Sequence, residues 1–247
     1  MQKDNWIPPP DSLDLESHHV DVWRIFLDLS ADSVELKEST LSANERERAS
    51  RFHFPKDSDR FIAAHGSLRE ILARYLHRKP AQLTFSVDQQ GKPALVDSKL
   101  EFNLSHSSDF ALLAVTRERN IGVDVERIRT DMELENIAIH NFSKIEISEL
   151  MALPLEQRIA GFFNCWTRKE AYIKAHGLGL SLPLDSFDVS LIPDQPANLR
   201  ATRPNPQEAV RWTMRSLDVA PNYAGALAVE GLGLVFRLWD WNLDAHK

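Results

Sequence analysis

Cysteine is nearly absent from this sequence of 247 residues, which contains a single one, Cys165. One cysteine cannot form a disulfide within the chain, and this fits a reducing compartment, so we expect a cytoplasmic protein. Cys165 lies on an apolar stripe beside Trp166. That position favours packing in a core over a role as a nucleophile.

An excess of positive charge and long apolar runs are lacking as well. The formal net charge is −7, and nucleic-acid binders usually carry a basic surface, so nucleic acid is not expected as a partner. A local basic site for a phosphorylated small molecule remains compatible with this balance. The first residues contain Asp4 and three prolines at 8–10 in place of the apolar run of a signal peptide, and no segment approaches a membrane span in length. We therefore expect no membrane association.

The stretch from 162 to 179 predicts a helix with one buried stripe, because its apolar residues recur near the helical period. These residues are Phe162, Phe163, Trp166 and Ile173. Gly177 is a natural end for the helix. Glu170 and Lys174 lie four residues apart on one face. Alone, this spacing is typical of an ordinary surface ion pair.

A second stretch, Gly122 to Glu126, predicts a strand whose two valines face one way and whose carboxylates, Asp124 and Glu126, face the other. This could be the solvated face of an edge strand. If Glu170 lies opposite, the three carboxylates instead form an oxygen cage of the kind that Mg²⁺ prefers, completed by substrate phosphates. Lys174 could then neutralise a phosphate oxygen. The sequence does not show whether the two stretches meet.

The chain also repeats its own pattern. Capping boxes at Ser42–Glu45 and Ser143–Glu146 predict helix starts 101 residues apart. A helix from Phe61 to Leu76 corresponds in the same way to the helix from 162. These offsets predict an α+β fold of two similar lobes, 1–118 and 119–247, each an antiparallel sheet packed with a long helix. No linker rich in glycine and serine separates them, so we expect the lobes to pack together.

The remaining elements follow from alternation and turn signals. Strands are expected at 22–29, 83–87, 102–105 and 110–116, and three more, at 212–217, 223–229 and 234–241, are expected to close the second half. The stretch from Pro193 to Glu208 reads as a loop. The stretch from Ile128 to Phe142 is more apolar than a free loop needs. It predicts either a short covering helix or a hydrophobic patch for a partner helix, beside Arg127 and Arg129.

Four motifs in order resemble the 4′-phosphopantetheinyl transferases. They are Gly91-Lys92-Pro93, Asn103-Leu-Ser105-His106-Ser107, Gly122-Val-Asp124-Val-Glu126 and Trp166-Thr-x-Lys169-Glu170-Ala-x-x-Lys174-Ala-x-Gly177-x-Gly179. The resemblance covers roughly residues 42 to 190. The length and the two-half layout are similar to the larger, surfactin-synthetase-activating type, a monomer of two pseudo-symmetric lobes. The small trimeric type would have a chain about half this length.

The resemblance implies transfer of the phosphopantetheine arm of coenzyme A to a serine of an apo acyl or peptidyl carrier protein, with Mg²⁺ required and 3′,5′-ADP released. The carriers would serve fatty-acid, polyketide or nonribosomal-peptide synthesis. It implies metal ligands at Asp124, Glu126 and Glu170, with Glu170 also cast as the base and Lys174 near the pyrophosphate. The coenzyme contacts it implies are Arg48, Arg60, Gly91, Lys92, Pro93, Ser105 and His106. Glu45 departs from the pattern, since a lysine is expected there, and this leaves the grip on the 3′-phosphate open.

Other functions remain possible on these residues. Another Mg²⁺-dependent phosphohydrolase or nucleotidyl enzyme could use the same carboxylates. A non-catalytic protein that binds coenzyme A or a carrier is a further alternative, although the complete carboxylate set and Lys174 argue against it. His106 in a serine-rich bend could also be a surface hydrogen-bonding residue, and Arg48 could belong to a solvated helix face.

Overall fold

The structure, a computed structural model, describes residues 3–87, 90–203 and 205–241. The first half of the chain forms β1 (His19–Phe26), α1 (Ala31–Thr40), α2 (Ala43–Ser50), α3 (Pro55–Leu76), η1 (Pro80–Gln82), β2 (Phe85–Val87), β3 (Pro93–Leu95), β4 (Leu100–Ser107) and β5 (Phe110–Arg117). The second half begins with β6 (Ile121–Arg127), α4 (Leu134–Asn141), α5 (Lys144–Ala152), α6 (Leu155–His176), η2 (Gly179–Ser181) and η3 (Leu184–Ser186). It continues with β7 (Phe187–Val189), β8 (Leu199–Thr202), η4 (Ala209–Arg211), β9 (Trp212–Leu217), β10 (Tyr223–Glu230) and β11 (Val235–Asp240). The predicted α+β class is confirmed.

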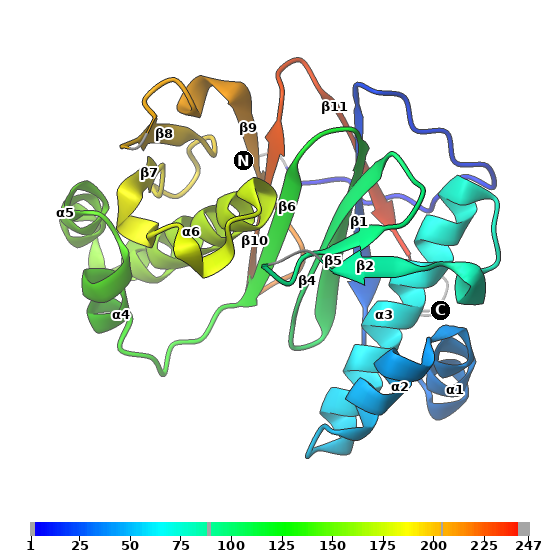
Figure 1. Ribbon diagram of the computed structural model, residues 1–247. Helices are drawn as coiled ribbons and strands as arrows, with labels where there is room; N and C mark the ends of the chain where they lie inside the picture. Colours follow the sequence, from blue (N-terminus) through cyan, green and yellow to red (C-terminus); the bar gives the residue numbers. More distant parts are fainter. Residues whose placement is uncertain (1–2, 88–89, 204, 242–247) are drawn as a thin grey trace.

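Two main sheets lie between two long helices (Figure 1). One sheet has the order β11-β1-β5-β4 and the other the order β6-β10-β9. Helix α3 covers the outer face of the first sheet, where Trp23 and Leu113 join its core. Helix α6 covers the outer face of the second, against Ala226 and Ala228. Their inner faces share a third core, so the two halves are packed together as predicted.

The predicted repeat of local structure is present. Both capping boxes form: the Ser42 and Ser143 hydroxyls accept from the third backbone N–H of their helices, and Glu45 and Glu146 reach back. Helices α3 and α6 both contain 22 residues. Helix α6 ends at Gly177, whose φ of 80° is the left-handed conformation that favours glycine.

Close approach of α6 to β6 depends on Gly122. A Cβ atom built at this position would lie 2.2 Å from the Ala171 carbonyl oxygen and 2.3 Å from the Ala175 nitrogen. Any side chain would therefore push the helix off the strand. The glycine brings the backbone that carries Glu170 and Lys174 directly against the strand that carries Asp124.

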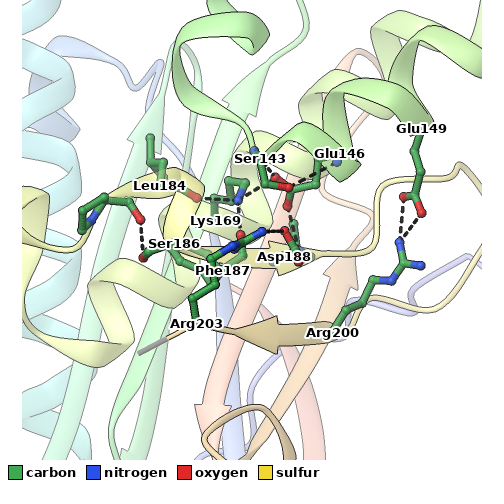
Figure 2. A network of polar contacts seen from close by, with 12 residues as sticks. Ser143, Glu146, Glu149, Lys169, Leu184, Ser186, Phe187, Asp188, Arg200 and Arg203 are labelled. Atoms are coloured by element: carbon green, nitrogen blue, oxygen red, sulfur yellow. Dashed lines mark hydrogen bonds and ion pairs between the residues drawn. The ribbon is translucent and has the colours of Figure 1, made fainter. Parts of the chain in front are cut away.

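A buried ion pair fixes the same helix from its other side (Figure 2). The Lys169 ammonium lies 2.8 Å from Glu146 Oε2, and both side chains are completely buried. Lys169 also donates to the carbonyls of Leu184 and Phe187, at 2.7 and 2.8 Å. Glu146 Oε1 accepts from the backbone N–H of Val189 at 2.8 Å. The pair thus joins α5, α6 and β7, with every ammonium hydrogen satisfied.

Several sequence predictions need correction. The strand expected at 234–241 exists as β11, but it pairs in parallel with β1 and does not close the second half. Helix α1 was not predicted, and β8 lies inside the stretch read as a loop. Trp166, expected in the buried stripe, is only partly buried at the edge of its core, whereas Phe162 is 2% exposed. No helix among the described residues is long and apolar enough to cross a membrane.

Candidate active site at the junction of the two sheets

Strands β4 and β6 lie side by side and are joined through the side chains of β4. Asn103 Oδ1 accepts from the Val123 N–H at 2.9 Å. The Ser105 hydroxyl donates to Asp124 Oδ1 at 2.9 Å. The Ser107 hydroxyl donates to Glu126 Oε2, also at 2.9 Å. Alternate residues of β4 therefore meet β6, as the two-residue period of a strand requires.

Lys174 brings α6 to this junction. Its ammonium lies 2.6 Å from Asp124 Oδ1 and donates to the Ser105 hydroxyl at 3.0 Å. Asp124 is 3% exposed. The two stretches whose meeting the sequence could not show are therefore in direct contact.

The three carboxylates act on one another. Burial raises the pKa of Glu126, and the negative charge of Asp124 raises it further. Burial likewise raises the pKa of Glu170, assisted by Asp124 and Glu126 and opposed by Lys174. Such mutual shifts mean that the negative charges are concentrated in one partly dry place, which favours a bound cation.

The carboxylates offer a set of oxygen donors that fits a metal ion. Asp124 Oδ2 is buried and has no hydrogen-bond partner among the described residues. The donors are the hard oxygens that Mg²⁺ prefers. Within residues 3–87, 90–203 and 205–241, no three histidine, cysteine, aspartate or glutamate side chains already surround a common metal position. The donor set and the orphaned oxygen fit Mg²⁺, and Lys174 is the cation that now balances Asp124.

A group of basic side chains lies on the other face of β4. His106 points toward α2 and α3, because it alternates with Ser105. Its pKa is lowered first by partial burial and then by the positive charges of His65, Lys174, Arg48 and Arg60. Arg60 is paired with Asp109. Positive charge is therefore concentrated here on a protein whose formal net charge is −7.

Glu45, the departure from the expected pattern, is occupied by the scaffold. It closes the capping box of α2 and accepts from Arg69 Nε at 2.8 Å. Burial alone would raise its pKa, but hydrogen bonds from His65, Arg69 and Ser42 lower it to about 2. Its charge is therefore already compensated and does not face the basic group as a free carboxylate.

The turn at residues 90–93 lies at the end of α6. A cavity of about 260 Å³ is lined by Gly91, Lys92, Pro93, Glu170 and Lys174, among others. The Lys92 ammonium donates to the backbone carbonyls of Ile121 and Lys174, at 3.1 and 3.0 Å. Lys92 thus holds the end of α6 against the first half, a role that the motif alone did not indicate.

A smaller cavity of about 120 Å³ adjoins Glu126 on the side of α4. It is lined by Arg127, Arg129, Met132, Phe162 and Trp166, among others. Both arginines are exposed. The stretch read from sequence as either a short helix or a patch forms α4, and its residues also line this cavity.

Residues 120–228 match the family model described as the 4′-phosphopantetheinyl transferase superfamily, and residues 30–118 match 4′-phosphopantetheinyl transferase, N-terminal. The chain is 40% identical over 245 residues to the 4′-phosphopantetheinyl transferase HetI of Nostoc sp. PCC 7120, covering 98% of this chain and 100% of the relative. This chain belongs to the 4′-phosphopantetheinyl transferase superfamily.

Two further relatives agree. The 4′-phosphopantetheinyl transferase Sfp of Bacillus subtilis strain 168 is 32% identical over 209 residues, which are 83% of this chain and 90% of the relative. A putative 4′-phosphopantetheinyl transferase of Synechocystis sp. PCC 6803, slr0495, is 34% identical over 182 residues, 72% of either chain. The family and the enzyme class predicted from the motifs are thereby confirmed.

Sequence reasoning missed some members of the site. His65 contributes charge at His106, and the hydroxyl of Ser107 holds Glu126. Ser107 could have been found, because Asn103, Ser105 and Ser107 alternate along one strand face. His65 carried no such signal, since it is one of many polar residues in the long helix α3.

Proposed function

We propose that this protein transfers the 4′-phosphopantetheine arm of coenzyme A to a serine hydroxyl of an apo carrier protein and releases 3′,5′-ADP. The observation that carries the proposal is the contact of Lys174 with Asp124 and Ser105, which brings a cation and a carboxylate together on one face of β4. Membership of the family and the names of the relatives support the same reaction.

The basic groups have separate roles in this proposal. Lys174 and Ser105 bind the pyrophosphate next to the carboxylates, while His106, Arg48 and Arg60 bind the 3′-phosphate. The adenine end occupies the cavity lined by Gly91, Lys92 and Pro93. The two faces of β4 thus separate the two phosphate positions.

The carboxylates supply the other half of the site. Asp124, Glu126 and Glu170 would hold Mg²⁺, which when bound neutralises phosphate oxygens during transfer. Ser105 and Ser107 orient two of these carboxylates through their hydroxyl groups. Glu170 lies on α6, is only partly buried and lines the cavity of about 260 Å³, and we assign it a second role in accepting the proton of the carrier serine.

The carrier is proposed to approach along α4. Exposed Arg127 and Arg129 border the cavity that adjoins Glu126, and charge pairing at such a rim sets the rate of encounter with an acidic partner. We further propose a monomer in the cytoplasm with lobes at 1–118 and 119–247. The boundary between the two matched family models supports this division, although β11 returns to the first sheet.

Intact mass spectrometry of a panel of apo carriers tests this function. Each carrier is incubated with the protein, coenzyme A and Mg²⁺, with chelator in a parallel sample. A gain of one phosphopantetheine group on at least one carrier is expected. Turnover of coenzyme A without any carrier would favour a phosphohydrolase, and coenzyme binding without turnover would favour a non-catalytic binding protein.

A further inference from the structure

A third cavity lies beside helix α6. It has a volume of about 420 Å³ and is lined by Tyr172, His176, Leu178, Leu182, Phe187 and Glu208, among others. Leu178 borders this cavity, whereas its neighbours Gly177 and Gly179 border the candidate coenzyme cavity. The chain between the two cavities makes them separate sites.

Tyr172 presents an unused hydroxyl to this cavity. The residue is 2% exposed, and its ring packs edge-on against Phe187 and Trp212, with centroid distances of 4.8 and 5.2 Å. Its hydroxyl makes no hydrogen bond within the described part of the chain, yet it is not sealed from solvent. Burial, with the charge of Glu208 adding to it, raises the pKa of Tyr172 to about 12. At neutral pH the group is therefore a protonated hydrogen-bond donor that has no acceptor among the described residues and remains open to a ligand.

His176, one helical turn later, also has a polar side-chain atom without a hydrogen-bond partner in the part of the chain that the structure describes. Its Nδ1 atom is buried without a partner among the described residues, and its ring stacks on Trp212. Buried polar atoms in folded proteins are nearly always hydrogen-bonded. His176 Nδ1 is such an exception, and the Tyr172 hydroxyl beside it also has no protein partner among the described residues, so the cavity offers two polar atoms that a ligand could satisfy.

The walls define the chemistry of that ligand. Aromatic rings and the leucine side chains favour a flat apolar body. Glu208, 13% exposed, accepts from Trp212 Nε1 at 2.8 Å and pairs with Arg211, and its negative charge disfavours an anion. We propose that this cavity binds a neutral, flat aromatic heterocycle whose hydrogen-bond acceptor receives the Tyr172 hydroxyl.

Quinoline and naphthalene form a matched pair of probes, because they differ in the ring nitrogen that would accept the hydrogen bond. Each is titrated into the full chain and followed by two-dimensional ¹H–¹⁵N NMR. Quinoline is expected to shift amides at the end of α6 and in β7. Tyr172→Phe keeps the ring and should weaken quinoline binding about fivefold, the worth of one hydrogen bond near 1 kcal/mol, while naphthalene binding is unchanged.

Tyr223→Phe is the matched control, since it removes a tyrosine hydroxyl that binds the Asp109 N–H elsewhere. It should leave the affinity for quinoline unchanged. Equal quinoline affinity in Tyr172→Phe and the native chain, or shifts confined to other regions, would overturn the proposal. So would the absence of quinoline binding at millimolar concentration. None of these measurements depends on transferase activity, so a failure here leaves the proposed function intact.

Discussion

Helices α3 and α6 carry the same pair of residue types at the same place, yet the two pairs do different things. In α3 the pair is Glu70 and Arg74, and in α6 it is Glu170 and Lys174, each four residues apart in a helix of 22 residues. Glu70 pairs with Lys37, and Arg74 donates to the carbonyls of Pro10 and Asp11. The pair of α3 therefore serves only to fasten neighbouring segments.

The difference comes from the partner strand and not from the helix. Lys174 meets Asp124 and Ser105 because Gly122 lets α6 lie against β6. Spacing on a helix thus predicts a face but not what the face meets. The interpretation of Glu170 and Lys174 as an ordinary surface ion pair is incomplete, because Lys174 pairs with Asp124, just as Glu70 pairs with Lys37 and not with Arg74.

Each of the two long helices also carries a buried cation that pairs with the glutamate of a capping box. Arg69 lies 2.7 Å from Glu45, donates to the carbonyls of Pro80 and Leu83 at 3.0 Å, and lies over the ring of Phe85. Lys169 repeats this arrangement with Glu146, Leu184 and Phe187 (Figure 2). Glu45 retains 17% exposure and Glu146 none. The glutamate of each capping box therefore ties a short helix to a long one, more tightly in the second half.

The largest expected effect distinguishes Glu170 of α6 from Glu70, which has the same position in α3. Glu170→Ala or Asp124→Ala should abolish transfer and leave the fold intact, because too few carboxylates then remain to hold the metal. Glu70→Ala, the matched control, should keep a near-normal rate and lose no more than about 1 kcal/mol of stability. Transfer rate and circular dichroism are measured together. Near-normal activity of either active-site variant at saturating Mg²⁺ would remove the distinction between the helices.

The second effect concerns the buried cations. Glu146→Ala leaves Lys169 charged in a dry site and should cost about 3–5 kcal/mol in the free energy of unfolding. Glu45→Ala should cost less, roughly 1–3 kcal/mol, because the Glu45 site reaches solvent and Arg69 keeps two carbonyl partners. Urea denaturation compares them. An equal or reversed order would show that the two ion pairs are equivalent in strength.

The two halves should also differ in pH dependence. The pKa of Glu45 is lowered from 4.5 to about 2, so its stabilising contribution is present above pH 4.5 and is lost as pH falls toward 2. The pKa of Glu170 is raised by burial, so stability falls as pH rises from 4.5 through that raised value. In metal-free buffer, Glu45→Gln should flatten the acid limb of the stability curve, and Glu170→Gln should stabilise at neutral pH. The free energy of unfolding of both variants is measured at a series of pH values. If both substitutions changed it in the same direction at each pH, the two halves would not differ in this way.

The smallest effect concerns surface charge. Arg127→Glu with Arg129→Glu should raise KM for the carrier several-fold and leave KM for coenzyme A nearly unchanged, an effect that salt should reduce. Arg78→Glu with Lys79→Glu makes the same charge change on the first half, where neither KM should move. Steady-state kinetics at two ionic strengths decide it. If both constants shift together, or neither does, the carrier docks elsewhere.

Local features of the fold could be predicted from the sequence. The capping boxes and the α6 terminus were predictable, because the interacting groups lie within three or four residues of each other. The Asp124–Glu126 strand and its alternation followed from the period of two. These are short-range constraints that a reader of the sequence can see directly.

Long-range pairings were not predictable in this way. The parallel contact of β11 with β1 joins residues more than 200 positions apart, and no local signal marks it. Lys92 binding to carbonyls of β6 and α6 is equally invisible, since a backbone acceptor has no sequence signature. The meeting of Asp124 with Lys174 was a conditional prediction for the same reason. The sequence therefore predicts the type of most elements better than it predicts which distant elements pair with each other.

The pairing of β11 with β1 has a consequence for the order of synthesis. The ribosome delivers β5 more than a hundred residues before β11, an interval on the order of ten seconds at ordinary elongation rates. During that time β1 has only β5 beside it, and the Ile7 backbone, which exchanges hydrogen bonds with Leu238 and Asp240, has no strand to join. The half of the protein that is made first is thus completed last, and a chain that terminates early leaves its older sheet unfinished.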